Sequence, residues 1–181
     1  MKKTIIIILL LILITGCKSI TYNTPTSKVS NFFSKYQTLN KSIIDELNLA
    51  IKKDKKKSNF EKEIYKQLLI KQYQNIEYKI KNEEVKNKDA YVDVEIEVYD
   101  YEKENYYSKK YFLSNLKLFN IKANENIEEN KKYKNYKLLK LKKTKKRKKY
   151  NITLHLKKDN NMWKMLNLTK EDLKKIHGFS S

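Results

Sequence analysis

The chain has 181 residues and a formal net charge of +20, and it contains two glycines, one proline and one cysteine. The length predicts one domain, the single cysteine excludes an internal disulfide, and the scarcity of glycine excludes glycine-rich phosphate loops and dinucleotide fingerprints. A charge of this size is typical of proteins that bind nucleic acid, anionic lipid or another polyanion. The positive charge has a second explanation, because Lys, Asn, Ile and Tyr are all abundant, as expected of an AT-rich genome. Binding to a polyanion and genome composition both stay open as causes.

The N-terminus has the layout of an export signal. Lys2 and Lys3 precede ten consecutive aliphatic residues at positions 5–14. Ten helical residues rise about 15 Å, which is about half the hydrocarbon thickness of a bilayer, so this run is too short for a stable membrane span. A charged start followed by a short apolar run predicts a secretory signal peptide.

The lone cysteine directly follows this apolar run. The sequence Ile14-Thr15-Gly16-Cys17 resembles the lipobox of bacterial lipoproteins, in which an aliphatic residue and two small residues precede the cysteine. The resemblance implies that Cys17 receives a diacylglycerol on its sulfur, becomes the new N-terminus after cleavage and is usually N-acylated as well. The protein is therefore expected to be extracytoplasmic and anchored to the bacterial membrane, because several acyl chains hold a protein durably. The alternative is an ordinary signal peptide with a cysteine beside its cleavage site by chance.

Composition divides the chain into four parts. Residues 1–16 form the signal peptide, and residues 17–27, which hold few apolar groups and the only proline, are predicted to be a lipidated tether. A single α+β domain is predicted over 28–178, followed by a tail at 179–181. As a flexible coil the tether spans about 18 Å, which would keep the domain close to the membrane.

Two helices are predicted at the start of the domain. Apolar residues recur at three- and four-residue steps across 28–52, with one polar lapse at Asn40, and this pattern predicts a single helix. A second helix is predicted from Ser58, because Ser58 and Glu61 have the spacing of a capping box. Both apolar stripes are interpreted as packing faces rather than ligand sites.

The repeat then changes to two residues, which is typical of strands with one buried face. Ile76, Tyr78 and Ile80 alternate with polar residues, and residues 92–98 alternate in the same way. With turn residues such as Asn87 between them, the two segments predict an antiparallel hairpin.

The outward positions of the second strand carry three acids, Asp93, Glu95 and Glu97. We interpret them as a solvated sheet face whose charges pair with Lys79 or Lys81 on the neighbouring strand. The alternative is a set of catalytic carboxylates, which would need a pocket that shifts their pKa values.

Helical spacing returns after the hairpin. A third helix is predicted over 104–119, with Tyr107, Tyr111 and Phe112 on its apolar face, and a fourth over about 127–142. Both predictions place aromatic side chains in the core of the domain.

The last third of the chain predicts a hairpin and a short helix. Residues 150–156 alternate like a strand, Asp159 and Asn160 provide the turn, and the partner strand contains Trp163, the expected core anchor. The final helix ends at Gly178, a residue type that favours helix termini.

The two N-terminal helices before a hairpin, and the segment "MWKMLNLTKEDLKKIHG" after a strand and a turn, resemble a group of small bacterial lipoproteins. Those proteins are similar to the nuclear-transport-factor-2-like, cystatin-like superfamily. The resemblance implies an α+β fold, in which a curved antiparallel sheet of about four strands packs on two long N-terminal helices. The expected shape is cone-like, with a short C-terminal helix, and the resemblance implies no particular chemistry.

The strongest functional hint is a basic segment over 131–149, which has twelve Lys or Arg and no acid. Each positive charge close to an anionic membrane contributes about 1 kcal/mol to binding. Nucleic acid is not an expected partner, because an exported protein has little access to it. A solvated loop enriched by composition is the alternative. The predicted contacts with anionic lipid or an envelope polymer are Lys142, Lys143, Lys145, Lys146, Arg147, Lys148 and Lys149.

No cofactor, metal site or catalytic residue is predicted. His155 lies on the polar side of its strand, and we expect its side chain to face water rather than a cavity inside the cone. His177 is expected to complement the C-terminus of the last helix.

Three function classes stay open. A non-enzymatic lipoprotein that binds a ligand or partner is preferred, ahead of an electrostatic adaptor for anionic lipid or wall polymer. The third is an enzyme that uses Asp93, Glu95 or His155 inside the cone.

Overall fold

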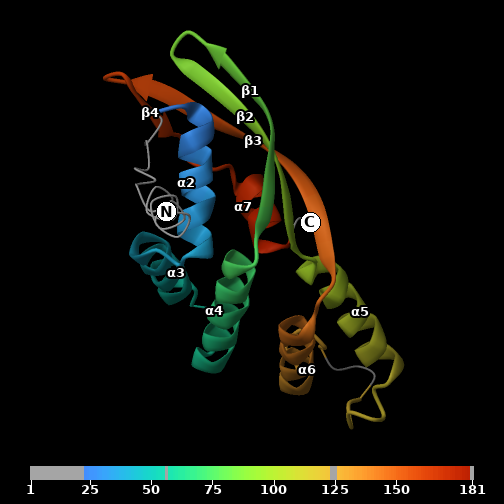
Figure 1. Cartoon of the computed structure of the whole chain (residues 1–181). Coiled ribbons are helices and arrows are strands. Elements are labelled where there is room, and N and C mark those ends of the chain that lie inside the picture. The colour runs from blue at the N-terminus through green and yellow to red at the C-terminus, as the bar shows by residue number, and fades with distance from the viewer. Residues whose placement is uncertain (1–22, 56, 123–125, 180–181) are drawn as a thin grey trace, which may run out of the picture.

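The computed structural model describes residues 23–55, 57–122 and 126–179. Cys17, the signal peptide and the first six residues of the predicted tether lie outside these ranges. Ten elements lie within them: α2 (Pro25–Gln37), α3 (Lys41–Lys53), α4 (Asn59–Gln74), β1 (Glu77–Lys86), β2 (Asp89–Tyr99), α5 (Tyr101–Ser114), α6 (Lys131–Lys143), β3 (Arg147–Asp159), β4 (Met162–Met165) and α7 (Lys170–His177). The four strands form an open antiparallel sheet in the order β1-β2-β3-β4, so the predicted α+β class is confirmed (Figure 1).

The first predicted helix is in fact two helices, so within the described residues α2, α3 and α4 precede the sheet rather than two long helices. Helix α2 ends at Gln37, Leu39 adopts a left-handed φ of 50°, and the Asn40 side chain caps α3 by accepting from the Ser42 N–H. The polar lapse in the apolar stripe is therefore a helix boundary, because a short polar side chain at this place satisfies free N–H groups of a new helix.

The folded part also begins earlier than the predicted boundary at residue 28. Thr24 and Ser27 form a capping box, and Pro25 occupies the first turn of α2. Proline suits this position because its fixed φ is helical and its missing N–H would have no partner there. The Asn23 side chain reaches the β3–β4 end of the sheet, donating to the Asn161 carbonyl (2.5 Å) and accepting from the Trp163 N–H (3.2 Å).

Asparagine provides the turns of both hairpins. Asn87 has a φ of 57° between β1 and β2, and Asn160 and Asn161 have φ values of 47° and 61° between β3 and β4. The second turn lies one residue later than the predicted Asp159–Asn160, because a two-residue turn of this kind needs positive φ at both central positions and asparagine tolerates it.

One face of the curved sheet is buried against helices. Alternate residues of β2 from Ala90 to Val98 are fully buried, and α2 and α7 contact the sheet on its inner side (Figure 1). Trp163 on β4 is only 7% exposed within the same core cluster, which confirms its prediction as a core anchor. The sheet therefore supplies a rigid wall on which the N-terminal and C-terminal helices are held together.

Helices α5 and α6 pack on each other beyond the end of the sheet (Figure 1). The predicted apolar face of α5 is only partly correct, since Phe112 is buried but Tyr107 and Tyr111 are 43% and 47% exposed. Helix α5 begins at Tyr101, which is fully buried and donates to the Leu68 carbonyl (3.0 Å). The buried face of α5 carries Tyr101, Ser108 and Phe112, and Tyr107 and Tyr111 lie to one side of it.

Candidate functional site

The seven predicted contact residues lie within residues 142–149, which we call the basic run. The basic run does not form a loop. Lys142 and Lys143 end α6, a short connection holds Lys145 and Lys146, and the remaining three cations open β3. Strand β3 therefore begins at Arg147, three residues before the predicted start at residue 150. Residues 147–149 are all basic, so they show no alternation of apolar and polar residues.

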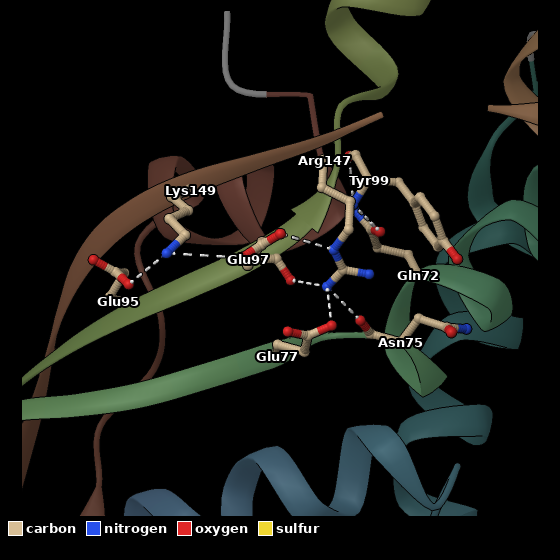
Figure 2. A network of polar contacts seen from close by, with 8 residues as sticks. All are labelled: Gln72, Asn75, Glu77, Glu95, Glu97, Tyr99, Arg147 and Lys149. Atoms are coloured by element: carbon tan, nitrogen blue, oxygen red, sulfur yellow. Dashed lines mark hydrogen bonds and ion pairs between the residues drawn. The ribbon is translucent and has the colours of Figure 1, made fainter. Parts of the chain in front are cut away.

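Arg147 is fixed inside the fold by four polar contacts (Figure 2). Its Nη2 donates to the main-chain carbonyls of Asn75 (2.9 Å) and Glu97 (2.8 Å), and it forms ion pairs with Glu77 (3.1 Å) and Glu97 (3.2 Å). The guanidinium also lies over the Tyr99 ring at 5.3 Å. A planar group with several donors can serve all these partners at once, so Arg147 joins the end of α4 to β1 and β2.

The neighbouring lysines pair with the acidic row of β2. Lys149 lies 3.3 Å from Glu95, and Lys81 on β1 lies 3.1 Å from the same carboxylate, as predicted for Lys81. Hydrogen bonds from Lys81 and then Lys149 lower the pKa of Glu95. Asp93 accepts from the Thr153 hydroxyl (2.7 Å). These acids are therefore engaged in cross-strand pairs along the outer face of the sheet.

Lys148 forms an ion pair with Glu102 of α5 (3.5 Å). The other four cations, Lys142, Lys143, Lys145 and Lys146, have no acidic partner among the described residues. Lys142 donates to the Gln67 side chain (3.1 Å), and Lys146 lies over the Tyr107 ring at 4.6 Å. Lys143 and Lys145 are exposed. Of the seven predicted contacts, these four keep their charge available to an external anion.

His155 lies on the outer face of the sheet, away from any enclosed space. Its ring stacks on Tyr91 at 4.6 Å, and its Nε2 is 2.8 Å from Asp89 Oδ1. Within the ranges that the structure covers, no three His, Cys, Asp or Glu side chains are grouped as metal ligands. None of the helices described there is long and apolar enough to cross a membrane.

A cleft of about 370 Å³ lies among α2, α3, α4 and α7. We call it the helical cleft. Every residue that lines it comes from these helices or from the α3–α4 connection, and none comes from the sheet. Its volume is within the range of small-molecule sites. The walls are mostly aliphatic: Ile43, Leu47, Ala50, Ile51, Leu69 and Leu173.

The inner end of the helical cleft is polar but uncharged. Tyr73 Oη lies 2.8 Å from His177 Nε2, and the Tyr36 ring meets the Tyr73 ring edge-on at 4.7 Å. Burial lowers the pKa of His177 to about 4 and raises the pKa of Tyr36 to about 12. His177 is therefore neutral at pH 7. It lies in the last turn of α7, as expected, but its ring is engaged with Tyr73.

The mouth of the helical cleft carries balanced charges. Glu46 and Asp54 supply two carboxylates, and Lys57 and Lys62 supply two ammonium groups, which gives a formal sum of zero. Lys57 and Asp54 form an ion pair with each other. An apolar cavity with a neutral floor and a balanced rim suits an uncharged or apolar group.

No pattern in the sequence indicates this cleft. Tyr73 belongs to a stripe that was interpreted as a packing face, and His177 was assigned to a helix terminus. Their side chains meet across 104 residues of sequence, and only the arrangement of the helices brings them together.

No protein-family model, no curated protein and no solved structure matches the chain. The functional interpretation therefore depends on the geometry of the molecule and on the motifs of its sequence.

Proposed function

We propose that this protein is an extracytoplasmic lipoprotein, anchored to a bacterial membrane through Cys17, whose helical cleft binds an apolar or amphipathic small molecule without transforming it. The observation that carries the proposal is the aliphatic cleft of about 370 Å³ whose inner polar groups are neutral and bonded to each other. Such a lining favours partition of an apolar chain over water by about 0.8 kcal/mol for each buried methylene.

The curved sheet supports the resemblance to the nuclear-transport-factor-2-like, cystatin-like superfamily. It bends around α2 and α7 (Figure 1), as the wall of a cone would. The proposed ligand site differs from a cavity inside such a cone, since only helical residues and the α3–α4 connection line it. In this proposal the sheet is the support and the helices form the site.

Filling the helical cleft should abolish binding of an apolar probe. Ala50 lines the cleft and is exposed, so Ala50→Trp adds a large side chain there without altering the core. We expect 1-octanol to slow hydrogen–deuterium exchange in α3 and α4 of the full chain, held in nanodiscs of zwitterionic lipid. The protection should disappear in Ala50→Trp, because the indole occupies the space that the alkyl chain needs.

Leu49→Trp is the matched control, because Leu49 is the preceding residue of α3, is 54% exposed and does not line the cleft. It should keep the protection by 1-octanol. Unchanged exchange in α3 and α4 of the wild type, or equal loss in both variants, would contradict ligand binding at this place.

The membrane anchor has its own test. Cys17→Ser removes the sulfur that the lipobox resemblance assigns to lipidation, so the variant should appear either unprocessed or released from membranes. Fractionation of cells, with the mass of the mature N-terminus, measures both outcomes. A variant that is cleaved at residue 17 and still sediments with membranes would show that the anchor is not a lipid on this cysteine.

A second function, as an electrostatic adaptor, is favoured by the position of the basic run. Asn23 is bonded at the β3–β4 turn, whereas Arg147 begins β3 at the other end of a 13-residue strand, about 40 Å away at the usual rise. Residues 17–22 span at most about 20 Å when extended. An upright domain would thus present its basic end to a polyanion away from its own anchor.

We expect the chain in zwitterionic nanodiscs to bind separate vesicles that contain anionic phosphatidylglycerol. Replacing Lys142, Lys143, Lys145 and Lys146 by Gln should weaken binding at least tenfold, because each cation near the surface is worth about 1 kcal/mol. The control variant replaces Lys35, Lys52, Lys53 and Lys55 by Gln, which removes the same charge from another part of the domain. It should weaken vesicle binding less. Equal losses of binding in the two variants would show that only the overall charge matters.

A further inference from the structure

A second, smaller pocket of about 200 Å³ adjoins the helical cleft, between α4, α5 and α6. We call it the basic pocket. Lys57 and Tyr65 line both spaces, so the two meet at these side chains. On α4 the cleft uses Lys62, Tyr65, Leu69 and Tyr73, and the basic pocket uses Glu61, Tyr65 and Leu68. At 3.6 residues per turn these sets are adjacent arcs of one helix.

The basic pocket differs from the helical cleft in charge. Lys57 also lines this pocket but is already paired with Asp54. Lys134 and Lys137 then stand against the single carboxylate of Glu61, which leaves a formal sum of +1. That carboxylate is already engaged, because it accepts from the Ser58 N–H (2.9 Å) and hydroxyl (2.8 Å) and lies 3.4 Å from Lys134. The Glu61 carboxylate is therefore largely engaged by the capping box and by Lys134, and leaves little negative charge for Lys137.

Lys137 is a half-buried cation without a carboxylate at ion-pair distance among the described residues. Burial lowers the pKa of its ammonium group, and Glu128 and Glu61 oppose this shift from beyond ion-pair distance. The ammonium also lies over the Tyr133 ring at 5.2 Å. A buried cation in such surroundings gains strongly from an anion placed beside it, because the local dielectric is low.

The same pocket contains a polar atom without a partner. Asn105 lines it, and Asn105 Oδ1 is buried with no hydrogen-bond partner within the described part of the chain. An unsatisfied buried acceptor costs stability, so it marks a place for a donor. Beyond these polar groups the floor is apolar, formed by Leu68, Leu138, Leu141 and Phe179.

We propose that the basic pocket holds the headgroup of an amphiphile whose alkyl chain lies in the helical cleft, and that the headgroup is a phosphate monoester. Its negative charge would meet Lys137 and Lys134, and a P–OH group would donate to Asn105 Oδ1. The ligand bridges the two spaces past Tyr65. This inference rests on the proposed function, since it names the class of ligand that the cleft takes.

Octyl phosphate and 1-octanol test the inference, because they share one alkyl chain and differ in the headgroup. In the full chain held in zwitterionic nanodiscs, hydrogen exchange should report octyl phosphate binding about tenfold tighter or more, as one charge-assisted hydrogen bond provides. It should also protect α6, which 1-octanol does not reach. Lys137→Met removes the charge and shortens the side chain by only one atom, and it should abolish the advantage of octyl phosphate while leaving 1-octanol binding unchanged.

Lys140→Met is the matched control, because Lys140 is one turn further along α6, is exposed and does not line the basic pocket. It should keep the preference for octyl phosphate. Equal affinity for both probes in the wild type, or equal losses in the two variants, would overturn the headgroup site and leave the helical cleft intact. Binding of neither probe would overturn the proposed function itself.

Discussion

Replacing Gly178 by alanine is expected to lower the free energy of unfolding by about 3 kcal/mol or more, measured by denaturant unfolding. Gly178 has a φ of 78° at the C-terminus of α7, and a left-handed conformation alone costs an alanine about 1–2 kcal/mol. An added Cβ would lie 2.3 Å from the Tyr99 carbonyl oxygen and 2.6 Å from Gln72 Nε2. Because the first of these is backbone, the clash adds an overpacking cost of about 1–3 kcal/mol.

The neighbours of Gly178 cannot move aside cheaply. Gln72 is fully buried, and its side chain accepts from the Tyr99 N–H (2.8 Å) and donates to the Tyr99 carbonyl (3.2 Å), continuing the sheet edge (Figure 2). Asn87→Ala is the control, because Asn87 has a φ of 57° in an exposed turn and reports the conformational cost alone. A loss no larger than that of Asn87→Ala would show that the packing around Gly178 is looser than described.

The second large effect is a dependence of stability on pH through His177. Burial lowers its pKa from 6.5 to about 4, so between these values the unfolded chain binds a proton that the folded chain does not. The contribution of His177 to the free energy of unfolding should therefore be constant above about pH 7 and fall as the pH drops from 6.5 to 4. Below that range carboxylates with lowered pKa values, such as Glu95, add a further loss. The expected loss through His177 is about 3 kcal/mol, from about 1.4 kcal/mol for each pH unit.

His177→Gln isolates this contribution, because glutamine can still hydrogen-bond the Tyr73 hydroxyl but does not titrate. Urea unfolding at pH values from 4 to 8 should show a flatter profile in the variant than in the wild type. Parallel profiles for the two proteins would mean that His177 is accessible to protons in the folded state and that the inner end of the helical cleft is open to water.

Local rules made much of the fold predictable. The capping box of Ser58 and Glu61 forms as expected, because both partners lie within one turn. The alternation of β2 gives its buried face, and Gly178 ends α7. Such features depend on residues that are close in sequence, where steric and hydrogen-bonding preferences are decided without the rest of the chain.

The errors arose where two local patterns competed. Asn40 interrupts a stripe that otherwise continues in phase, and only its capping of α3 shows that the helix breaks there. Tyr107 and Tyr111 have the spacing of an apolar face, but the face of α5 that packs inward carries Tyr101, Ser108 and Phe112. Apolar spacing indicates which residues share a face, whereas tertiary contacts decide which face is buried.

The candidate site was beyond the reach of the sequence for a different reason. Leu47, Leu69 and Leu173 belong to three helices whose apolar faces all look like packing surfaces. Whether such faces fill the space between them depends on the angles and distances of the helices. In this chain a cleft remains among α2, α3, α4 and α7.

An experimental structure of the chain with octyl phosphate bound would test this account most directly. The account predicts continuous density for the alkyl chain along Leu47 and Leu69 in the helical cleft, with the phosphate beside Lys137. A cleft closed by its own side chains, or a ligand seated elsewhere on the molecule, would contradict it.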